Sequence, residues 1–181
     1  VDTTGLSEKT AKTPHPKSNP DAVVTVVEYG DLQCPACKGA YTYLVGPLLE
    51  KYGSKMRFEF HQFPLSGVHE YAMIAAESAE CAADQGKFWE FVDTDYTHQD
   101  QLNKDAIDTW ATDLKLDMDL FHRCQKSHIK RKAIAAEYDE GVKLGVRGTT
   151  TFAVNGQIVE NTIESLGKAI DAASSSAAAK L

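Results

Sequence analysis

Residues 22–37 read AVVTVVEYGDLQCPAC, and this stretch decides the fold that we expect of the chain. Residues 22–29 are mostly apolar and rich in β-branched valine, which is typical of a buried strand. Residues 30–33 contain glycine and aspartate and form the turn, so that a helix should begin near Cys34 and end near Gly53. The stretch predicts a strand, a tight turn and a helix whose first turn carries two cysteines.

Hydrophobic periodicity predicts the elements that follow. Apolar side chains alternate over residues 56–63, which indicates a second strand, and Pro47 should kink the helix between the two strands. Helical spacing of apolar residues continues through residues 69–144, with a break at Gln85–Gly86. Asn155–Gly156 is a typical hairpin turn between two short strands.

The element order is β-α-β, then several helices, then β-β-α. A mixed four-stranded sheet with an inserted helical subdomain accounts for this order, so we predict an α/β fold. The expected divisions are a flexible N-terminal leader over 1–21, the first part of the fold over 22–66, the inserted helical subdomain over 67–145, the second part over 146–173 and a C-terminal tail over 174–181.

Composition excludes several classes of function. The 181 residues carry a formal net charge of −7 and no long basic run, so nucleic-acid binding is not expected. No apolar run approaches the roughly 18 residues that a membrane span requires. The chain begins at Val1 rather than Met, and a signal peptide or a membrane anchor upstream of Val1 therefore stays open.

The pair Cys34 and Cys37, with Pro35 and Ala36 between them, carries the candidate chemistry. A helix N-terminus stabilises a thiolate, which is the reactive form of cysteine, and the spacing lets the two sulfurs form a disulfide. Cys34 lies nearer the helix end and should be the nucleophile, whereas Cys37 should be the resolving thiol. The alternative is half of a zinc site, but no second C-x-x-C or H-x3-H pair accompanies it, so we expect no metal.

The chain resembles the DsbA-like oxidoreductases of bacterial cell envelopes, which have a thioredoxin fold. The resemblance is carried by VVEYGDLQCPAC, FHQFPL, AAESAECAADQGKFWEF and GVRGTTTFAVNG, at residues 26–37, 60–65, 75–91 and 145–156. It implies a thioredoxin fold with an inserted helical subdomain, no cofactor, and exchange of disulfides with other proteins.

The resemblance also assigns roles to residues around the cysteines. Glu28 stands where the family places an acidic residue beneath the disulfide, and there it would accept the proton of Cys37; the alternative is an ordinary charge near a strand end. Thr149 would offer backbone hydrogen bonds to an extended substrate peptide, and Pro35 and Thr150 would adjoin the same substrate.

Thr150 departs from the family pattern, which has a cis-proline at this position. The loop is therefore either trans or holds a cis bond before a non-proline residue. The threonine hydroxyl could bond Cys34, slow the release of a mixed disulfide, or leave room for a metal.

Cys81 and Cys124 fall in two different helices of the inserted segment. Because related sequences can carry cysteines in such places, we predict a structural disulfide between them, which an oxidising compartment permits. The alternative is two buried cysteines that stay unpaired.

The hypothesis for function is a thiol:disulfide oxidoreductase that introduces disulfides into secreted or envelope proteins. Its partners would be unfolded or reduced secreted proteins and a membrane redox partner of the DsbB or VKOR type. Its location would be extracytoplasmic, in the periplasm or on the outer face of a bacterial membrane. The alternatives are a disulfide isomerase or reductase of the same fold, and a thioredoxin-fold binding module with poor turnover.

Overall fold

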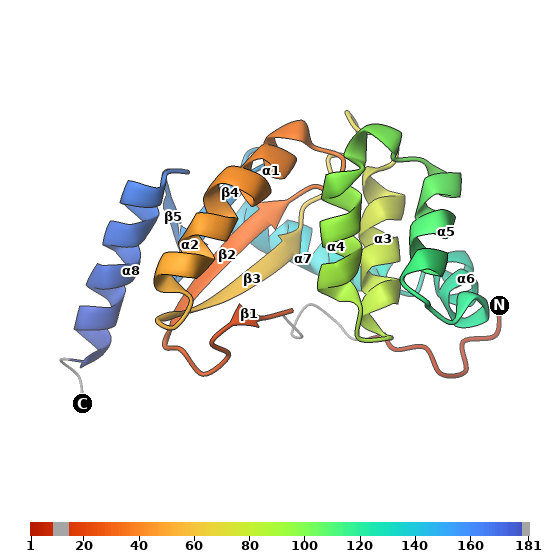
Figure 1. Cartoon of the computed structure of the whole chain (residues 1–181), viewed down its shortest axis with the longest axis horizontal. Helices are drawn as coiled ribbons and strands as arrows, with labels where there is room; N and C mark the ends of the chain where they lie inside the picture. Colours follow the sequence, from red (N-terminus) through yellow and green to blue (C-terminus); the bar gives the residue numbers. More distant parts are fainter. Residues whose placement is uncertain (9–14, 179–181) are drawn as a thin grey trace.

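A computed structural model describes residues 1–8 and 15–178, and its described strands form one mixed sheet in the order β1-β3-β2-β4-β5. β2 and β3 run parallel, and every other neighbouring pair is antiparallel. The expectation of a mixed α/β fold with a helical insertion is confirmed (Figure 1). The strands are β1 (Lys17–Ser18), β2 (Val24–Gly30), β3 (Met56–Gln62), β4 (Thr151–Val154) and β5 (Gln157–Val159).

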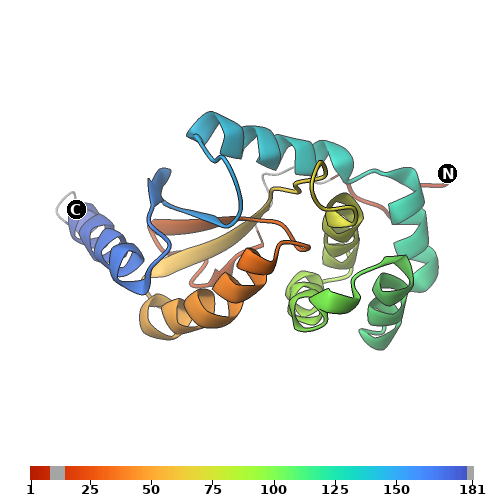
Figure 2. The ribbon, with the colours of Figure 1, turned by 90° about the horizontal axis from the view of Figure 1, so that it is seen from above.

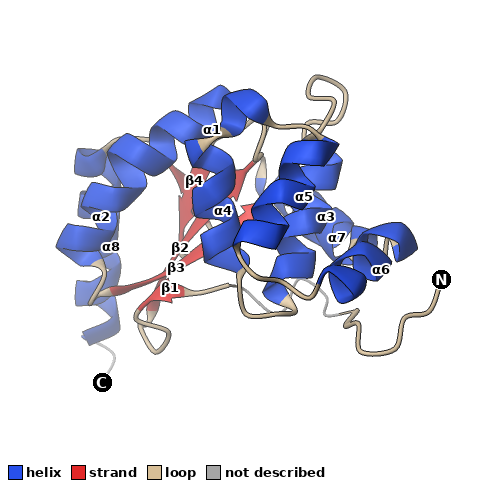
Figure 3. Cartoon of the chain, turned by 45° about the vertical axis from the view of Figure 1, so that its right-hand side comes forward, coloured by secondary structure: helices blue, strands red, loops and turns tan. Residues whose placement is uncertain are grey.

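Helices cover both faces of the sheet and form a separate bundle beside it (Figures 2 and 3). α7 lies against one face, whereas α1, α2 and α8 lie against the other (Figure 2). α3, α4, α5 and α6 make up the bundle (Figure 3). The helices are α1 (Pro35–Ala40), a π-helical turn η1 (Tyr41–Val45), α2 (Gly46–Tyr52), α3 (Ala72–Ala83), α4 (Phe88–Thr97), a 3₁₀ turn η2 (Gln99–Gln101), α5 (Lys104–Asp113), α6 (Met118–Ser127), α7 (Arg131–Leu144) and α8 (Ile163–Ala178).

The first helix is irregular where a kink is expected. The π-helical turn η1 interrupts it between α1 and α2, and Pro47 is the second residue of α2. Proline has no N–H to bond the carbonyl four residues earlier, so a wider turn just before it accommodates the missing bond.

The two ends of the chain differ from expectation. Within the expected leader, Lys17 and Ser18 pair with the edge of β3, which gives the described sheet a fifth strand rather than the expected four. The pairing joins segments that lie 40 residues apart in the chain, and within it the Phe58 N–H donates to Ser18 Oγ. Local sequence patterns carry no signal of such a distant contact. Residues 9–14 lie outside the described residues.

The expected tail over 174–181 is helical as far as Ala178, and residues 179–181 lie outside the described part. Alanine favours helix, and the serine hydroxyls bond back to carbonyls one turn earlier, as Ser174 does to Ile170 at 2.8 Å. The other divisions of the chain stay predictions.

The sheet buries apolar side chains on each face. On one face Val24 and Val26 of β2 pack with Leu48 of α2 and Leu166 of α8. On the other face Tyr29 packs with Phe63 beside α7. Glu28 lies on the same face of the sheet as Val24 and Val26, because alternate residues of β2 point to the same side.

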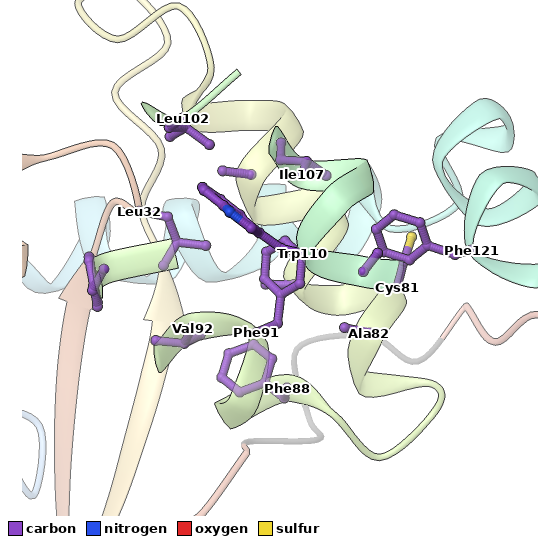
Figure 4. Packing of buried hydrophobic residues seen from close by; sticks show 14 of the residues in the cluster. Leu32, Cys81, Ala82, Phe88, Phe91, Val92, Leu102, Ile107, Trp110 and Phe121 are labelled. Carbon is purple, nitrogen blue, oxygen red and sulfur yellow. The ribbon is translucent and has the colours of Figure 1, made fainter. Parts of the chain in front are cut away.

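The inserted helices have an apolar core of their own. Phe91, Trp110 and Phe121 meet in its centre beside Cys81 (Figure 4). Two of its helices have side-chain N-caps: Asn103 accepts from the Ala106 N–H at 2.9 Å, and Asp117 accepts from the Leu120 N–H at 3.0 Å.

Candidate active site

The junction between β2 and α1 places the two cysteines at the start of a helix. Cys34 has extended backbone angles and precedes the first helical residue, Pro35, whose missing N–H costs nothing there. Cys37 lies one turn further and is fully buried, whereas Cys34 is 7% exposed and Pro35 is exposed. Both cysteines are free thiols in this structure. The order of exposure agrees with Cys34 as the thiol that substrates reach.

The environment of Cys34 favours its thiolate. A hydrogen bond from the Cys37 thiol is the main cause that lowers the pKa of Cys34 to about 5; a contact with Thr149 and the N–H groups of Cys37 and Ala36 also lower it, against the effect of burial. The same hydrogen bond and burial raise the pKa of Cys37 above its ordinary value, and the nearby Glu28 raises it further. At neutral pH the pair therefore holds a thiolate at Cys34 and a proton at Cys37.

Glu28 is a fully buried acid within electrostatic range of Cys37. Its Oε1 accepts a hydrogen bond from the Thr150 hydroxyl at 3.0 Å, and its Oε2 has no partner among the described residues. Burial raises the pKa of Glu28 to about 8, although the Thr150 bond opposes the rise. A charged residue at an ordinary strand end would be exposed to solvent, whereas Glu28 is buried.

The loop before β4 faces Cys34. Its Thr149–Thr150 peptide bond is cis, one of the two forms that the sequence left open. The Thr149 carbonyl lies 3.8 Å from Cys34 Sγ and accepts a hydrogen bond from Cys34 when that residue is protonated. The Thr150 hydroxyl donates its hydrogen bond to Glu28 rather than to Cys34. Across residues 1–8 and 15–178, no group of three or more His, Cys, Asp or Glu could hold a metal ion.

Asp31 is a site residue that the sequence analysis treated only as part of a turn. It is 1% exposed, and its Oδ1 accepts from the Gln33 N–H at 2.8 Å, the usual bond of an aspartate turn. Its Oδ2 accepts from the Leu65 N–H at 2.9 Å and contacts His69 Nδ1 at 2.7 Å. Only the Gln33 bond is local, so the sequence carried a signal for the turn and none for the other two partners.

The helical bundle also holds the active-site turn. The Gln99 side-chain amide donates to the carbonyls of Leu32 at 2.7 Å and Cys34 at 3.1 Å. Asp95 and Tyr96 of α4 are buried, and neither side chain has a hydrogen-bond partner among the described residues. Burial is the main cause that raises the pKa of both, and the charge of Asp31 adds to it. Sequence reasoning missed all three residues, since they are distant in the chain.

The second cysteine pair is a disulfide between α3 and α6. Cys81 and Cys124 are each 1% exposed, and their Cα atoms are 5.9 Å apart. Figure 4 shows Cys81 beside Phe121 in the core of the bundle. The alternative of two unpaired cysteines is not what this structure contains.

Comparison with known proteins decides the family. A family model described as thioredoxin matches residues 10–172. The chain belongs to the thioredoxin family. A probable disulfide bond formation protein D of Bacillus anthracis is 32% identical over 164 residues, covering 83% of this chain and 74% of that protein. The resemblance to DsbA-like proteins is thus confirmed, and a thiol–disulfide oxidoreductase is the general class that it supports.

Solved structures of other proteins share the fold of this chain. A thioredoxin-like oxidoreductase from Silicibacter pomeroyi has a TM-score of 0.75 at 25% identity, covering 96% of this chain and 98% of that one. BdbD from Bacillus subtilis also has a TM-score of 0.75, at 19% identity, covering 96% and 95% of the two chains.

Other relatives are longer proteins named as sodium/proton antiporters. A sodium/proton antiporter, NhaA 3, of Salinispora tropica is 40% identical over 165 residues, which is 90% of this chain and 25% of that protein. The chain thus spans about a quarter of the length of such relatives. Among the described residues of this family member, no helix has the length and apolar character needed to cross a membrane.

Proposed function

We propose that the chain introduces disulfide bonds into secreted or envelope proteins through Cys34 and Cys37. The observation that carries this proposal is the stabilised thiolate at Cys34, whose pKa is lowered to about 5 chiefly by the Cys37 hydrogen bond. A stable thiolate favours the reduced form of the pair. Its disulfide therefore gives up its oxidising equivalents readily.

The reaction begins on the oxidised protein. A substrate thiolate attacks Cys34 Sγ, the Cys34–Cys37 bond breaks, and the electron pair stays on Cys37, which takes up a proton. Glu28, with its pKa raised to about 8 by burial, holds a proton at neutral pH and would supply it; in the reverse direction it would accept the Cys37 proton.

A second substrate thiolate then attacks the substrate sulfur of the mixed disulfide. Cys34 leaves as its stabilised thiolate, the substrate gains a disulfide, and the protein has gained two electrons. A membrane partner of the DsbB or VKOR type would remove those electrons outside the cytoplasm. Thr149 and Pro35 flank Cys34 and would contact the substrate backbone.

The reduction potential of the Cys34–Cys37 pair tests the direction of electron flow. We expect equilibration with glutathione to give a value near the oxidising end of the family, about −120 mV, rather than the value of about −270 mV typical of thioredoxin. A thioredoxin-like value would assign a reductase. A pair that forms no disulfide would assign a binding module. Efficient rescue of a scrambled protein would favour the isomerase.

The antiporter relatives favour a second candidate, a thiol-exchange module that acts beside a membrane transporter. Its basis is the 40% identity over 90% of this chain. Trapping with Cys37→Ser in membranes of the source organism tests it. A covalent adduct with an ion transporter would support this candidate, whereas adducts only with secreted proteins would exclude it.

A further inference from the structure

The Asp31 main-chain amide touches a reacting atom. Its N–H donates to Cys37 Sγ, with the nitrogen 3.4 Å from the sulfur. This contact lowers the pKa of Cys37, in opposition to the larger effects of Cys34 and of burial that raise it. A hydrogen bond to sulfur strengthens when the sulfur becomes charged, so it acts most when Cys37 is a thiolate.

The Asp31 side chain holds that amide in place. The carboxylate, buried with its residue 1% exposed, receives the Gln33 N–H on Oδ1 and the Leu65 N–H on Oδ2. The first bond closes the active-site turn upon itself. The second ties the turn to the connection between β3 and α3.

His69 completes the set of contacts around the carboxylate. Its Nδ1 lies 2.7 Å from Asp31 Oδ2, and its side chain is 18% exposed. Because a carboxylate oxygen only accepts, the ring nitrogen donates its proton here. The Tyr71 N–H also donates to Gln33 Oε1, at 2.6 Å, so that the same connection holds the turn twice.

We infer that Asp31 and His69 are positioning residues for Cys37, which hold the Asp31 N–H against its sulfur and so stabilise the thiolate that forms when the disulfide opens. The inference deepens the proposed function and rests on it. In the first step a substrate thiolate bonds to Cys34, the Cys34–Cys37 bond breaks, and the negative charge develops on Cys37 beside this N–H. The reduced protein carries a proton on Cys37, so the effect falls on the rate more than on the equilibrium.

Two substitutions of His69 separate positioning from general damage. The amide nitrogen of asparagine occupies the place of ring Nδ1, whereas that of glutamine occupies the place of Nε2. H69N should therefore keep the bond to Asp31 Oδ2, and H69Q should lose it. H122N is the matched control, because His122 contacts Asp108 through Nε2, at 3.2 Å, in the helical bundle, and asparagine should lose this contact. D31N is the partner variant, since an amide nitrogen at Oδ2 would face the Leu65 N–H.

The experiment measures the rate at which a cysteine-containing peptide opens the disulfide of the full oxidised chain. We expect H69Q and D31N to react about tenfold more slowly, and H69N and H122N to react as the wild type does. The reduction potential and the ultraviolet titration of the Cys34 thiolate should stay unchanged in H69Q.

Two results would overturn the inference. One is a wild-type rate in H69Q; the other is an equal loss in H69N and H69Q together with a shifted Cys34 titration. If D31N does not fold, the two histidine variants still decide. A thioredoxin-like potential in the wild type would refute only the proposed oxidase, since the opening rates of the variants can be compared in either case.

Discussion

The chain contains two cysteine pairs with different surroundings. Cys34 and Cys37 lie three residues apart at a helix N-terminus, next to a buried acid and an adjoining loop. Cys81 and Cys124 are 43 residues apart and join two helices inside an apolar core. Polar neighbours shift the pKa values of the first pair in opposite directions, whereas the second pair has aromatic neighbours that stabilise no thiolate. The comparison teaches that the same side chain is reactive or structural according to what surrounds its sulfur.

Loss of Cys34 should have the largest effect. Cys34→Ser removes the sulfur that substrates attack, so oxidation of a peptide dithiol should fall to the uncatalysed rate, as followed by chromatography of the peptide. Cys124→Ser should retain the activity, because Cys124 lies in the bundle core. Retained turnover in Cys34→Ser would show that the reactive pair has been misassigned.

Cys37→Ser should convert the enzyme into a trap. Without the second thiol, a mixed disulfide at Cys34 has no intramolecular route of escape, and adducts should accumulate on a non-reducing gel. Cys81→Ser is the control. Its mixed disulfide at Cys34 should be released as fast as that of the wild type. A Cys37→Ser protein that turns over normally would contradict the assignment of Cys37 as the resolving thiol.

Removal of the second pair should lower stability and leave exchange intact. For a sequence separation of 43, the chain-entropy description gives about 4 kcal/mol, which lies within the roughly 2 to 5 kcal/mol typical of the loss of a native disulfide. Urea unfolding of Cys81→Ala/Cys124→Ala measures the loss, with Cys34→Ser/Cys37→Ser as the control.

Thiol counting gives an independent check of this disulfide. After mild oxidation, the four cysteines should leave no free thiol in denaturant.

A Cys81→Ala/Cys124→Ala variant with wild-type stability and poor exchange would reverse the roles of the two pairs.

Glu28 should change stability by less than the chain-entropy value for the second disulfide, and this change should depend on pH. The unfolded acid titrates near 4.5 and the folded one near 8, so the folded protein binds one more proton between these values and loses stability as pH rises through them. Glu28→Gln should therefore stabilise the reduced protein, whose cysteines are free thiols as in this structure, by roughly 3 kcal/mol at neutral pH, and by little near pH 4. Parallel urea-unfolding curves for the two proteins at all pH values would contradict this cost of burial.

Several features of the fold follow from local sequence. The valine-rich run before Cys34, the alternation over residues 56–63 and the Asn155–Gly156 turn each predict an element that the structure contains. Asn103 and Asp117 predict their helix starts, because a cap bonds a backbone N–H only two or three residues away.

The site was predictable to a smaller extent. Cys34 and Cys37 lie where their motif predicts, and the resemblance supplied Glu28 and the loop at Thr149. Asp31, His69 and Gln99 escaped prediction because their decisive contacts join residues 34 to 67 positions apart. Short-range patterns carry no signal of such contacts.

By itself the sequence determined the strand–turn–helix junction, the order of the cysteines in it and the family to which they belong. These depend on backbone preference and on spacing within one turn of helix. Only the tertiary structure decided that Thr150 bonds Glu28, that Asp31 receives bonds from the connection after β3, and that residues 17–18 extend the sheet. Each of these contacts needs the sheet and the helical bundle to be assembled first, since the partner groups meet only after the chain has folded.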